Sequence, residues 1–324
     1  MLRALFMSLL RGLAVVAGVV TLTFFLLRFA PGDPAERLLG PAASAEQVAA
    51  QRRALGLDRP LAAQYGAWVA DIALGEWGTS IATGRPVSRM IGGAWPFTVR
   101  LVGLSLALSY LAGIAIGAAQ AARGGSRTDT TLSVVTVSLF AMPGYWLGLM
   151  LVMLFTYQLR MLPSFGAAGL DADFLTPGAR LADAARHLAL PLLTLVLIGL
   201  GGTARYVRAA MLDLRSAQFA TVAASKGIGE RRIVYHHLLR NALIPVVTLL
   251  GLSLPALFSG AVFIEAIFAW PGVGRVLVEG VQARDYPVVM AATTISAVLV
   301  VAGNLLAEAL TAVVDPRLRR PAAP

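Results

Sequence analysis

Long apolar stretches alternate with short polar segments along this chain. The apolar stretches lie near residues 8–28, 99–121, 132–157, 188–209, 243–267 and 288–313. A helix needs about 20 predominantly apolar residues to cross the hydrocarbon core of a bilayer. The pattern therefore predicts an all-α membrane protein with six transmembrane helices. We interpret the first stretch as an uncleaved span, because it ends at Arg28 rather than at a small-residue cleavage site.

The polar segments define the expected organisation. Residues 1–29 form the first transmembrane helix, and residues 30–97 form a segment outside the cytoplasm between the first two helices. The other five helices fall within residues 98–313, and residues 314–324 form a cytoplasmic tail. The segment 30–97 is too short for an enzyme domain, so we interpret it as a cap or a docking surface.

This outer segment carries its own helix signals. Ser44 and Gln47 have the spacing of a capping box, and Gly56 is well placed as a helix stop. We therefore expect a short helix near 45–55. A second, amphipathic helix is expected over 61–74.

Composition and charge give an orientation. Hydrophobic residues make up 57% of the chain and charged residues only 14%, against about 25% charged residues in soluble domains. With the N-terminus inside, the inner segments hold fourteen of the 27 Lys and Arg residues and four of the 17 acids. Cytoplasmic loops are enriched in Lys and Arg, so we place both termini in the cytoplasm. No compact basic domain carries the net charge of +10, which argues against a nucleic acid as partner.

We find no catalytic or metal-binding constellation. The chain has no cysteine, which excludes disulfides and thiolate metal sites. His236 and His237 are adjacent, so on a helix they do not present one face to a metal ion. The motifs of serine hydrolases, zinc proteases and phosphate-binding loops are missing from the sequence. We expect no cofactor in this chain, and any nucleotide hydrolysis to belong to another subunit.

Three polar residues lie inside the expected spans. Asn304 and Glu308 are four residues apart and share a helix face, and Glu265 lies toward the outer end of the fifth stretch. Charges in a membrane usually face protein or water. For Glu308 we weigh packing against a proton relay and favour packing. For Glu265 we weigh a place in a transport pathway against a bond to the following loop, 268–275, whose Gly and Pro content indicates a re-entrant or surface loop.

The most informative polar segment lies between the fourth and fifth apolar stretches. It is basic and helix-compatible, runs from 221 to 245, and has Gly227 as a break between two short helices, with Pro245 opening the next span. We expect Ala220, Ala223 and Ala224 to form an exposed, small apolar face that enters a partner's groove. Positive charge around that face would orient it on an acidic rim. The basic residues are Lys226, Arg231, Arg232 and Arg240.

At these residues the chain resembles the type-1 ABC importer permeases, and within them the first permease of the dipeptide, oligopeptide and nickel group. Ser225-Lys226-Gly227 approaches the Ala-Lys-Gly ending of the peptide branch, and His237 to Val246 carries its His-x-Leu-Arg-Asn-Ala-Leu-x-Pro-Val continuation in full. Of the general Glu-Ala-Ala form, expected at Thr221-Val222-Ala223, only Ala223 matches. Further matching pieces follow in family order: Pro31 to Pro34, Leu55 to Pro60, Gly75 to Ser80, Thr203 to Arg208, Trp270 to Arg275, Arg284 to Val289, Asn304 to Glu308 and Asp315 to Arg319.

The resemblance implies a mechanism and a set of partners. It implies a type-1 ABC importer fold in the bacterial cytoplasmic (inner) membrane and a heterodimer with a homologous second permease. Two ABC ATPase subunits, which use ATP and Mg, would bind coupling helices at about 212–240, and an extracytoplasmic substrate-binding protein would deliver peptides. The residues implied to couple to the ATPases are Ala223, Ala224, Lys226, Gly227, Glu230, Arg231, Arg240, Asn241 and Pro245.

Alternatives stay open at this point. Nickel, glutathione and other peptide-like solutes share the architecture, and no residue here separates them. A stand-alone secondary transporter would need an ion-coupling group in the membrane, and only Glu265 and Glu308 offer one. An intramembrane enzyme would need a nucleophile or a set of metal ligands, and we find neither.

Overall fold

The computed structural model describes residues 2–29, 32–40 and 42–314. Within these residues the chain is mostly helical and forms no strand beyond one isolated bridge between Thr79 and Pro86. The α-helices are α1 (Leu2–Phe29), α2 (Pro34–Leu39), α3 (Ala45–Ala54), α4 (Leu61–Leu74), α5 (Val87–Ala122), α6 (Arg127–Ala141), α7 (Gly144–Val152), α8 (Pro177–Arg215), α9 (Gln218–Ser225), α10 (Glu230–Arg232), α11 (Leu239–Ile267), α12 (Val273–Ala283) and α13 (Tyr286–Val314). Two π-helical segments, η1 (Met153–Gln158) and η3 (Ile233–Leu238), and a 3₁₀ turn, η2 (Ala172–Phe174), complete the described elements.

Four described helices are long and apolar enough to cross a membrane. They are Phe6–Phe29, Val87–Ala122, Pro177–Arg215 and Tyr286–Leu306. A fifth candidate consists of Arg127–Ala141 together with Gly144–Gln158. The remaining predicted span, 243–267, falls within α11, several of whose side chains lie outside the described part of the chain.

The predicted span at 132–157 is not one straight helix. Its two halves, α6 and α7 with η1, meet at an angle of 104°. The break falls at Met142, whose backbone is extended with ψ of 135°, just before Pro143. A residue that precedes proline is pushed out of the helical region, and proline itself donates no hydrogen bond to the preceding turn. The apolar run therefore continues through a sharp corner.

Two helices are longer than predicted. α5 begins at Val87, whereas the apolar span was predicted from about 99, and α8 begins at Pro177, whereas its span was predicted from about 188. α8 starts with a Thr176 side chain that accepts a hydrogen bond from the backbone N–H of Ala179. A polar cap of this kind starts a helix well before its apolar section.

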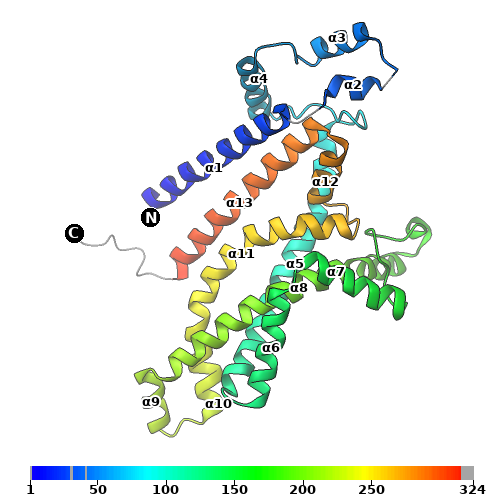
Figure 1. Cartoon of the computed structure of the whole chain (residues 1–324). Coiled ribbons are helices and arrows are strands. Elements are labelled where there is room, and N and C mark those ends of the chain that lie inside the picture. Colours follow the sequence, from blue (N-terminus) through cyan, green and yellow to red (C-terminus); the bar gives the residue numbers. More distant parts are fainter. Residues whose placement is uncertain (1, 30–31, 41, 315–324) are drawn as a thin grey trace.

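The α2–α4 segment contains α3 and α4, which the sequence predicts, and also α2, which it does not. Ser44 and Gln47 make both hydrogen bonds of a capping box at the start of α3, and Gly56 follows its end with a φ of +65°. α4 rests on the end of α1, where the ring of Phe24 lies 5.4 Å from that of Tyr65 and 5.5 Å from that of Trp68. These contacts hold α4 beside the last turns of α1 (Figure 1).

The long helices α5 and α8 pack against each other closely. α5 carries Gly113 and Gly117, four residues apart, at this contact. A Cβ added at Gly117 would lie 2.5 Å from the carbonyl oxygen of Ala204, and one at Gly113 would lie 2.6 Å from Cβ of Thr203. Small residues at this spacing let two membrane helices bring their backbones together. α1 and α13 lie side by side at some distance from this pair, and α11 runs between the two groups (Figure 1).

Buried hydrogen bonds join α12 and α13 to the N-terminal half of the chain. The carboxylate of Asp285, just before α13, accepts from the Oγ of Ser80 at 2.5 Å and from the backbone N–H groups of Ile81 and Ala82, each at 3.1 Å. The stretch 268–275, predicted to be a loop throughout, turns and then enters α12 at Val273. The backbone N–H of Val273 donates to Oγ1 of Thr98 in α5 at 2.9 Å.

We predict that Gly117→Val lowers the stability of the folded chain by about 1–3 kcal/mol, because the added methyl groups force α5 away from α8. Thermal unfolding of the detergent-purified protein measures the loss. Gly103→Val is the matched control, since Gly103 lies on the same helix and a Cβ there meets no atom within 4 Å. Equal stability of the two variants would contradict the proposed importance of this crossing.

Candidate functional site

The segment between α8 and α11 forms a compact hairpin at one end of the molecule (Figure 1). α9 ends at Ser225, and Gly227 adopts a φ of +74°, a backbone conformation open mainly to glycine. The N–H of Ile228 then donates to the carbonyl of Ala223 at 3.2 Å, which closes the helix end. The predicted break at Gly227 between two helices is confirmed.

The predicted exposed alanine face is wrong for two of its three residues. Ala220 and Ala223 are only 5% and 7% exposed, and Ala220 packs in an apolar cluster with Met211 of α8 and Val234 of η3. Ala224 is exposed, as expected. Small side chains let a short helix lie close to the helices it packs on, and this is why Ala220 and Ala223 face inward.

Larger apolar side chains take the outward face of α9. Phe219 is 39% exposed and Val222 is 44% exposed. They are three residues apart and share one side of the helix, which we call the α9 outer face. Periodicity alone did not separate the two faces of α9, because apolar residues occupy both.

The hairpin also carries exposed charged side chains. Lys226, Arg231, Arg232 and Arg240 are all exposed. Glu230 is exposed too and pairs with Arg215 of α8 at 2.5 Å. The amide of Asn241 donates to the carbonyl of His237 at 2.7 Å and stabilises the same helix.

Pro245 does not begin a new helix, although it lies near the start of the span predicted at 243–267. The helix runs without interruption from α10 through η3 into α11, and Pro245 lies in its second turn after Leu239. A proline inside a helix leaves the carbonyl four residues earlier without its usual donor. Here that carbonyl belongs to Asn241, close to the hairpin.

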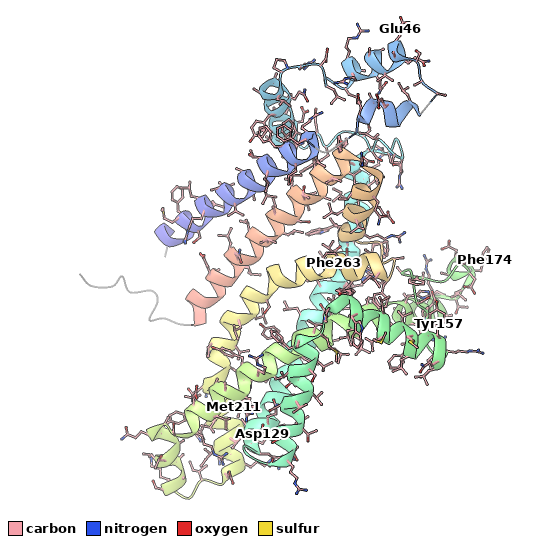
Figure 2. All side chains as sticks on the ribbon, in the orientation of Figure 1. Glu46, Asp129, Tyr157, Phe174, Met211 and Phe263 are labelled. Atoms are coloured by element: carbon pink, nitrogen blue, oxygen red, sulfur yellow. The ribbon has the colours of Figure 1, made fainter. Side chains whose placement is uncertain are left out.

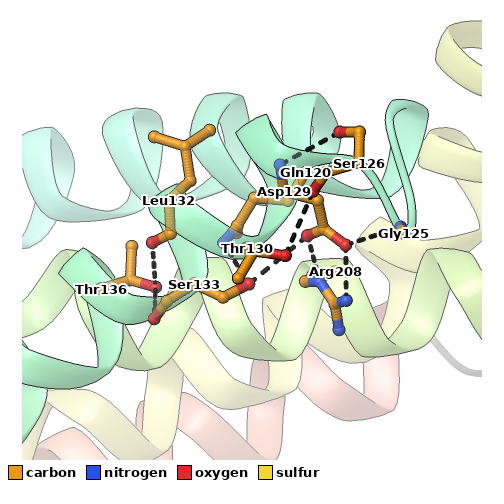
Figure 3. A network of polar contacts seen from close by, with 9 residues as sticks. All are labelled: Gln120, Gly125, Ser126, Asp129, Thr130, Leu132, Ser133, Thr136 and Arg208. Atoms are coloured by element: carbon orange, nitrogen blue, oxygen red, sulfur yellow. Dashed lines mark hydrogen bonds and ion pairs between the residues drawn. The ribbon is translucent and has the colours of Figure 1, made fainter.

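An ion pair with a buried carboxylate and a half-buried guanidinium lies at the hairpin end of the molecule, and the sequence interpretation did not single it out. Arg208 of α8 donates two parallel hydrogen bonds, both 2.7 Å long, to the carboxylate of Asp129 in the first turn of α6 (Figure 3). The Asp129 side chain is only 3% exposed. The two residues are 79 positions apart in the sequence. Each is a single charged residue near the end of an apolar helix, and nothing in the sequence pattern indicates that they form a pair.

Glu265 contacts the loop that follows its own helix. It is fully buried, and its Oε2 accepts from the backbone N–H of Gly274 at 2.7 Å. A Cβ added at Gly274 would lie 2.8 Å from that oxygen, so the glycine lets the backbone reach the carboxylate. From the sequence, Glu265 was expected either to line a transport pathway or to bond to the following loop, and the structure contains the bond to the loop. Asn304 and Glu308, in contrast, are exposed on α13.

A cleft of about 370 Å³ opens where α5, α7, α8 and α11 meet near the corner between α6 and α7. Its described lining includes Phe140 and Tyr145 on the two sides of that corner, and Tyr110, whose hydroxyl lies 2.7 Å from that of Ser253. No residue that lines it among the described ones is charged. No three described His, Asp or Glu side chains gather so as to hold a metal ion.

Comparison with known proteins identifies the family. A family described as "Binding-protein-dependent transport system inner membrane component" matches residues 109–320, and the N-terminal part of the membrane component of such systems matches residues 1–102. The first match alone covers more than half of the chain. The chain belongs to this family.

Named relatives agree over nearly their full length. The oligopeptide transport system permease protein AppB of Bacillus subtilis (strain 168) is 37% identical over 95% of this chain and 96% of its own. The probable D,D-dipeptide transport system permease protein DdpB of Escherichia coli (strain K12) is 38% identical over 94% of each chain. The glutathione transport system permease protein GsiC of Salmonella choleraesuis (strain SC-B67) is 36% identical over 93% of this chain and 94% of its own.

Family membership assigns the hairpin, the cleft and the apolar helices to a transport protein. The chain is a permease component of an ABC transport system in the inner membrane, and a transport subunit rather than an ATPase.

For Glu265 we predict different results from two substitutions. Glu265→Gln should keep uptake near the wild-type level, because the amide oxygen still accepts from the N–H of Gly274. Glu265→Ala should lower the stability by about 1–3 kcal/mol, because it leaves that N–H buried without a partner. Thermal unfolding and uptake into membrane vesicles measure the two effects. A well-folded Gln variant without uptake would instead assign the carboxylate to the transport pathway.

Proposed function

We propose that this chain is the first permease of an ATP-driven importer and forms one half of a peptide pathway across the cytoplasmic membrane. The observation that carries the proposal is the hairpin between α8 and α11, which presents exposed apolar side chains and exposed cations at one end of a bundle of membrane helices. The peptide and glutathione systems named for its relatives support the choice of cargo.

The proposed topology has six spans. The four straight candidates, the bent pair of α6 and α7, and α11 are these spans. The α2–α4 segment lies outside the cytoplasm, and the hairpin and both chain termini lie inside. The residues of the expected tail, 315–324, fall outside the described part of the chain.

We propose three kinds of partner for this chain. A homologous second permease would complete the pathway, and two ATPase subunits would supply the ATP and Mg chemistry. An extracytoplasmic binding protein would deliver the cargo to the α2–α4 side.

Energy would enter through the hairpin. The α9 outer face, with Phe219 and Val222, would fill an apolar groove of one ATPase, as an amphipathic helix fills a groove of its partner. Lys226 and Arg231 would meet acidic groups at the rim and set the orientation. Because α9 contacts α8 and η3 and its Ala220 packs in a cluster with residues of both, a displacement of α9 would be passed to the ends of those helices.

The cleft suits a cargo that varies in side chain and charge. Its hydroxyl groups, from Ser109, Tyr110, Tyr145 and Ser253, can bond to peptide groups. Its lining has no fixed charge that would favour one sign of side chain. The described lining contains no histidine, whose imidazole is a usual ligand of nickel. This favours a peptide over nickel as the cargo.

We predict that Gly227→Pro and Val222→Glu each abolish ATP-dependent uptake while the protein still inserts into the membrane. Proline is locked at a φ near −65° and does not adopt the +74° of Gly227. Glutamate at 222 places a charge in the apolar contact with the ATPase. Uptake and ATPase stimulation in vesicles that contain the whole complex measure the effect.

The matched controls are Gly227→Ala and Val222→Ala, which change the same positions more gently. We expect partial activity from both, with a strain of about 1–2 kcal/mol at position 227. Full uptake with the proline and glutamate variants would refute the assignment of the hairpin.

The cargo itself is tested on the partner binding protein. We expect di- or oligopeptides to bind to it and to be taken up by the complex when ATP is present. Binding of nickel or glutathione alone would replace peptide as the cargo. Uptake driven by a proton gradient without ATP would refute an ATP-driven importer altogether.

A further inference from the structure

We infer that the ion pair between Arg208 and Asp129 is a coupling joint, through which movement of the hairpin end of α8 is passed to α6 and so to the cleft. This inference rests on the proposed function and names two positioning residues for it. Neither residue belongs to the hairpin surface or to the cleft lining.

Asp129 is firmly held by the turn between α5 and α6. Its Oδ2 accepts from the backbone N–H of Gly125 at 3.0 Å, and its own N–H donates to Oγ of Ser126, the N-cap of α6, at 3.2 Å. As an acid in the first turn it also interacts favourably with the helix dipole. The side-chain amide of Gln120 in α5 donates to Ser133 of α6 at 3.1 Å and ties the same turn together. The carboxylate therefore moves with α5 and α6 as one body (Figure 3).

Arg208 belongs to the part of α8 on which the hairpin rests. Its neighbours in the helix, Val207 and Met211, are fully buried in the same apolar cluster as Ala220 of α9 and Leu238 of η3. Met211 and Asp129 lie at the same end of the molecule, close to α9 (Figure 2). A displacement of α9 that shifts α8 consequently shifts the guanidinium group of Arg208.

α6 leads from this joint directly to the cleft. Asp129 is in its first turn and Phe140, which lines the cleft, is in its last. Between them α6 packs tightly on α8, since a Cβ added at Gly201 would lie 2.5 Å from the carbonyl oxygen of Thr136. A rigid helix of 15 residues carries a shift of its first turn to the corner at Met142.

Packing alone would hold α6 against α8, so the charged pair needs a separate reason. A buried ion pair adds little net stability, because desolvation offsets the attraction between the charges. A bidentate contact between a guanidinium and a carboxylate is directional, however, and fixes the relative position of the two groups. It therefore resists sliding of α8 along α6, which smooth apolar surfaces would allow.

The test uses the whole complex in proteoliposomes with its ATPases and binding protein, and measures cargo moved per ATP hydrolysed. We expect Asp129→Asn and Arg208→Lys to lower this ratio about tenfold, while the amount of complex and its ATPase activity stay near wild type. Arg208→Lys keeps the positive charge but cannot donate the two parallel hydrogen bonds of a guanidinium. This variant therefore distinguishes the effect of the directional contact from the effect of the charge.

The double variant Arg215→Gln/Glu230→Gln is the matched control. It removes the neighbouring exposed ion pair, and exposed pairs contribute little, so its ratio should not change. An unchanged ratio in Asp129→Asn and Arg208→Lys would overturn the joint. So would a parallel fall of ATPase activity, uptake and complex in both variants, because the pair would then serve assembly only. Lack of ATP-dependent uptake by the wild-type complex would instead refute the proposed function.

Discussion

The close approach of α5 and α8 determines how the other helices of this bundle are placed. Apolar side chains gain little by leaving lipid for one another, so helices in a membrane associate where their backbones fit closely. Gly113 and Gly117 remove the side chains that would separate α5 from Thr203 and Ala204. The opposite side of α8 repeats the arrangement, with Gly201 against α6. Three helices thus form a tight stack, and α11 and α7 pack on it and leave the neutral cleft at its middle.

Polar groups fix the two ends of this stack. At the hairpin end, Arg208 joins α8 to the first turn of α6. At the opposite end, Glu265 and Thr98 bind the start of α12, and Asp285 binds the turn at residues 80–82. A polar bond in a dry environment is directional and costly to leave unmade. The ends are therefore held in register, while a single hydrogen bond between side chains, those of Tyr110 and Ser253, crosses the described lining of the cleft, which can change shape with less loss.

Local signals were sufficient for much of this fold. The length of the apolar stretches predicted the long helices, and Ser44, Gln47 and Gly56 predicted α3, because each signal acts within a few residues. The corner at Met142 was missed because the apolar run continues across it, although Pro143 is a local signal for a break. The pairs Arg208–Asp129 and Asp285–Ser80 join residues 79 and 205 positions apart, and no property of a single sequence places such residues together. The burial of Ala220 and Ala223 was missed for a similar reason, because only the packing of α9 on α8 and η3 decides which apolar face turns inward.

The orientation of α9 explains which part of the family signature this chain keeps. Of the three positions that correspond to Glu-Ala-Ala, Thr221 and Val222 depart from the general form and Ala223 matches it. Thr221 and Val222 are exposed, whereas Ala223 is buried against the chain's own helices. A larger side chain at 223 would push α9 off the bundle, and that constraint holds whatever the partner. In the proposed complex the exposed positions would meet only the ATPase, so they would be free to change together with it. On this reading the alanine of the signature belongs to the permease's own core, and specificity for a particular ATPase lies in the residues on either side of it.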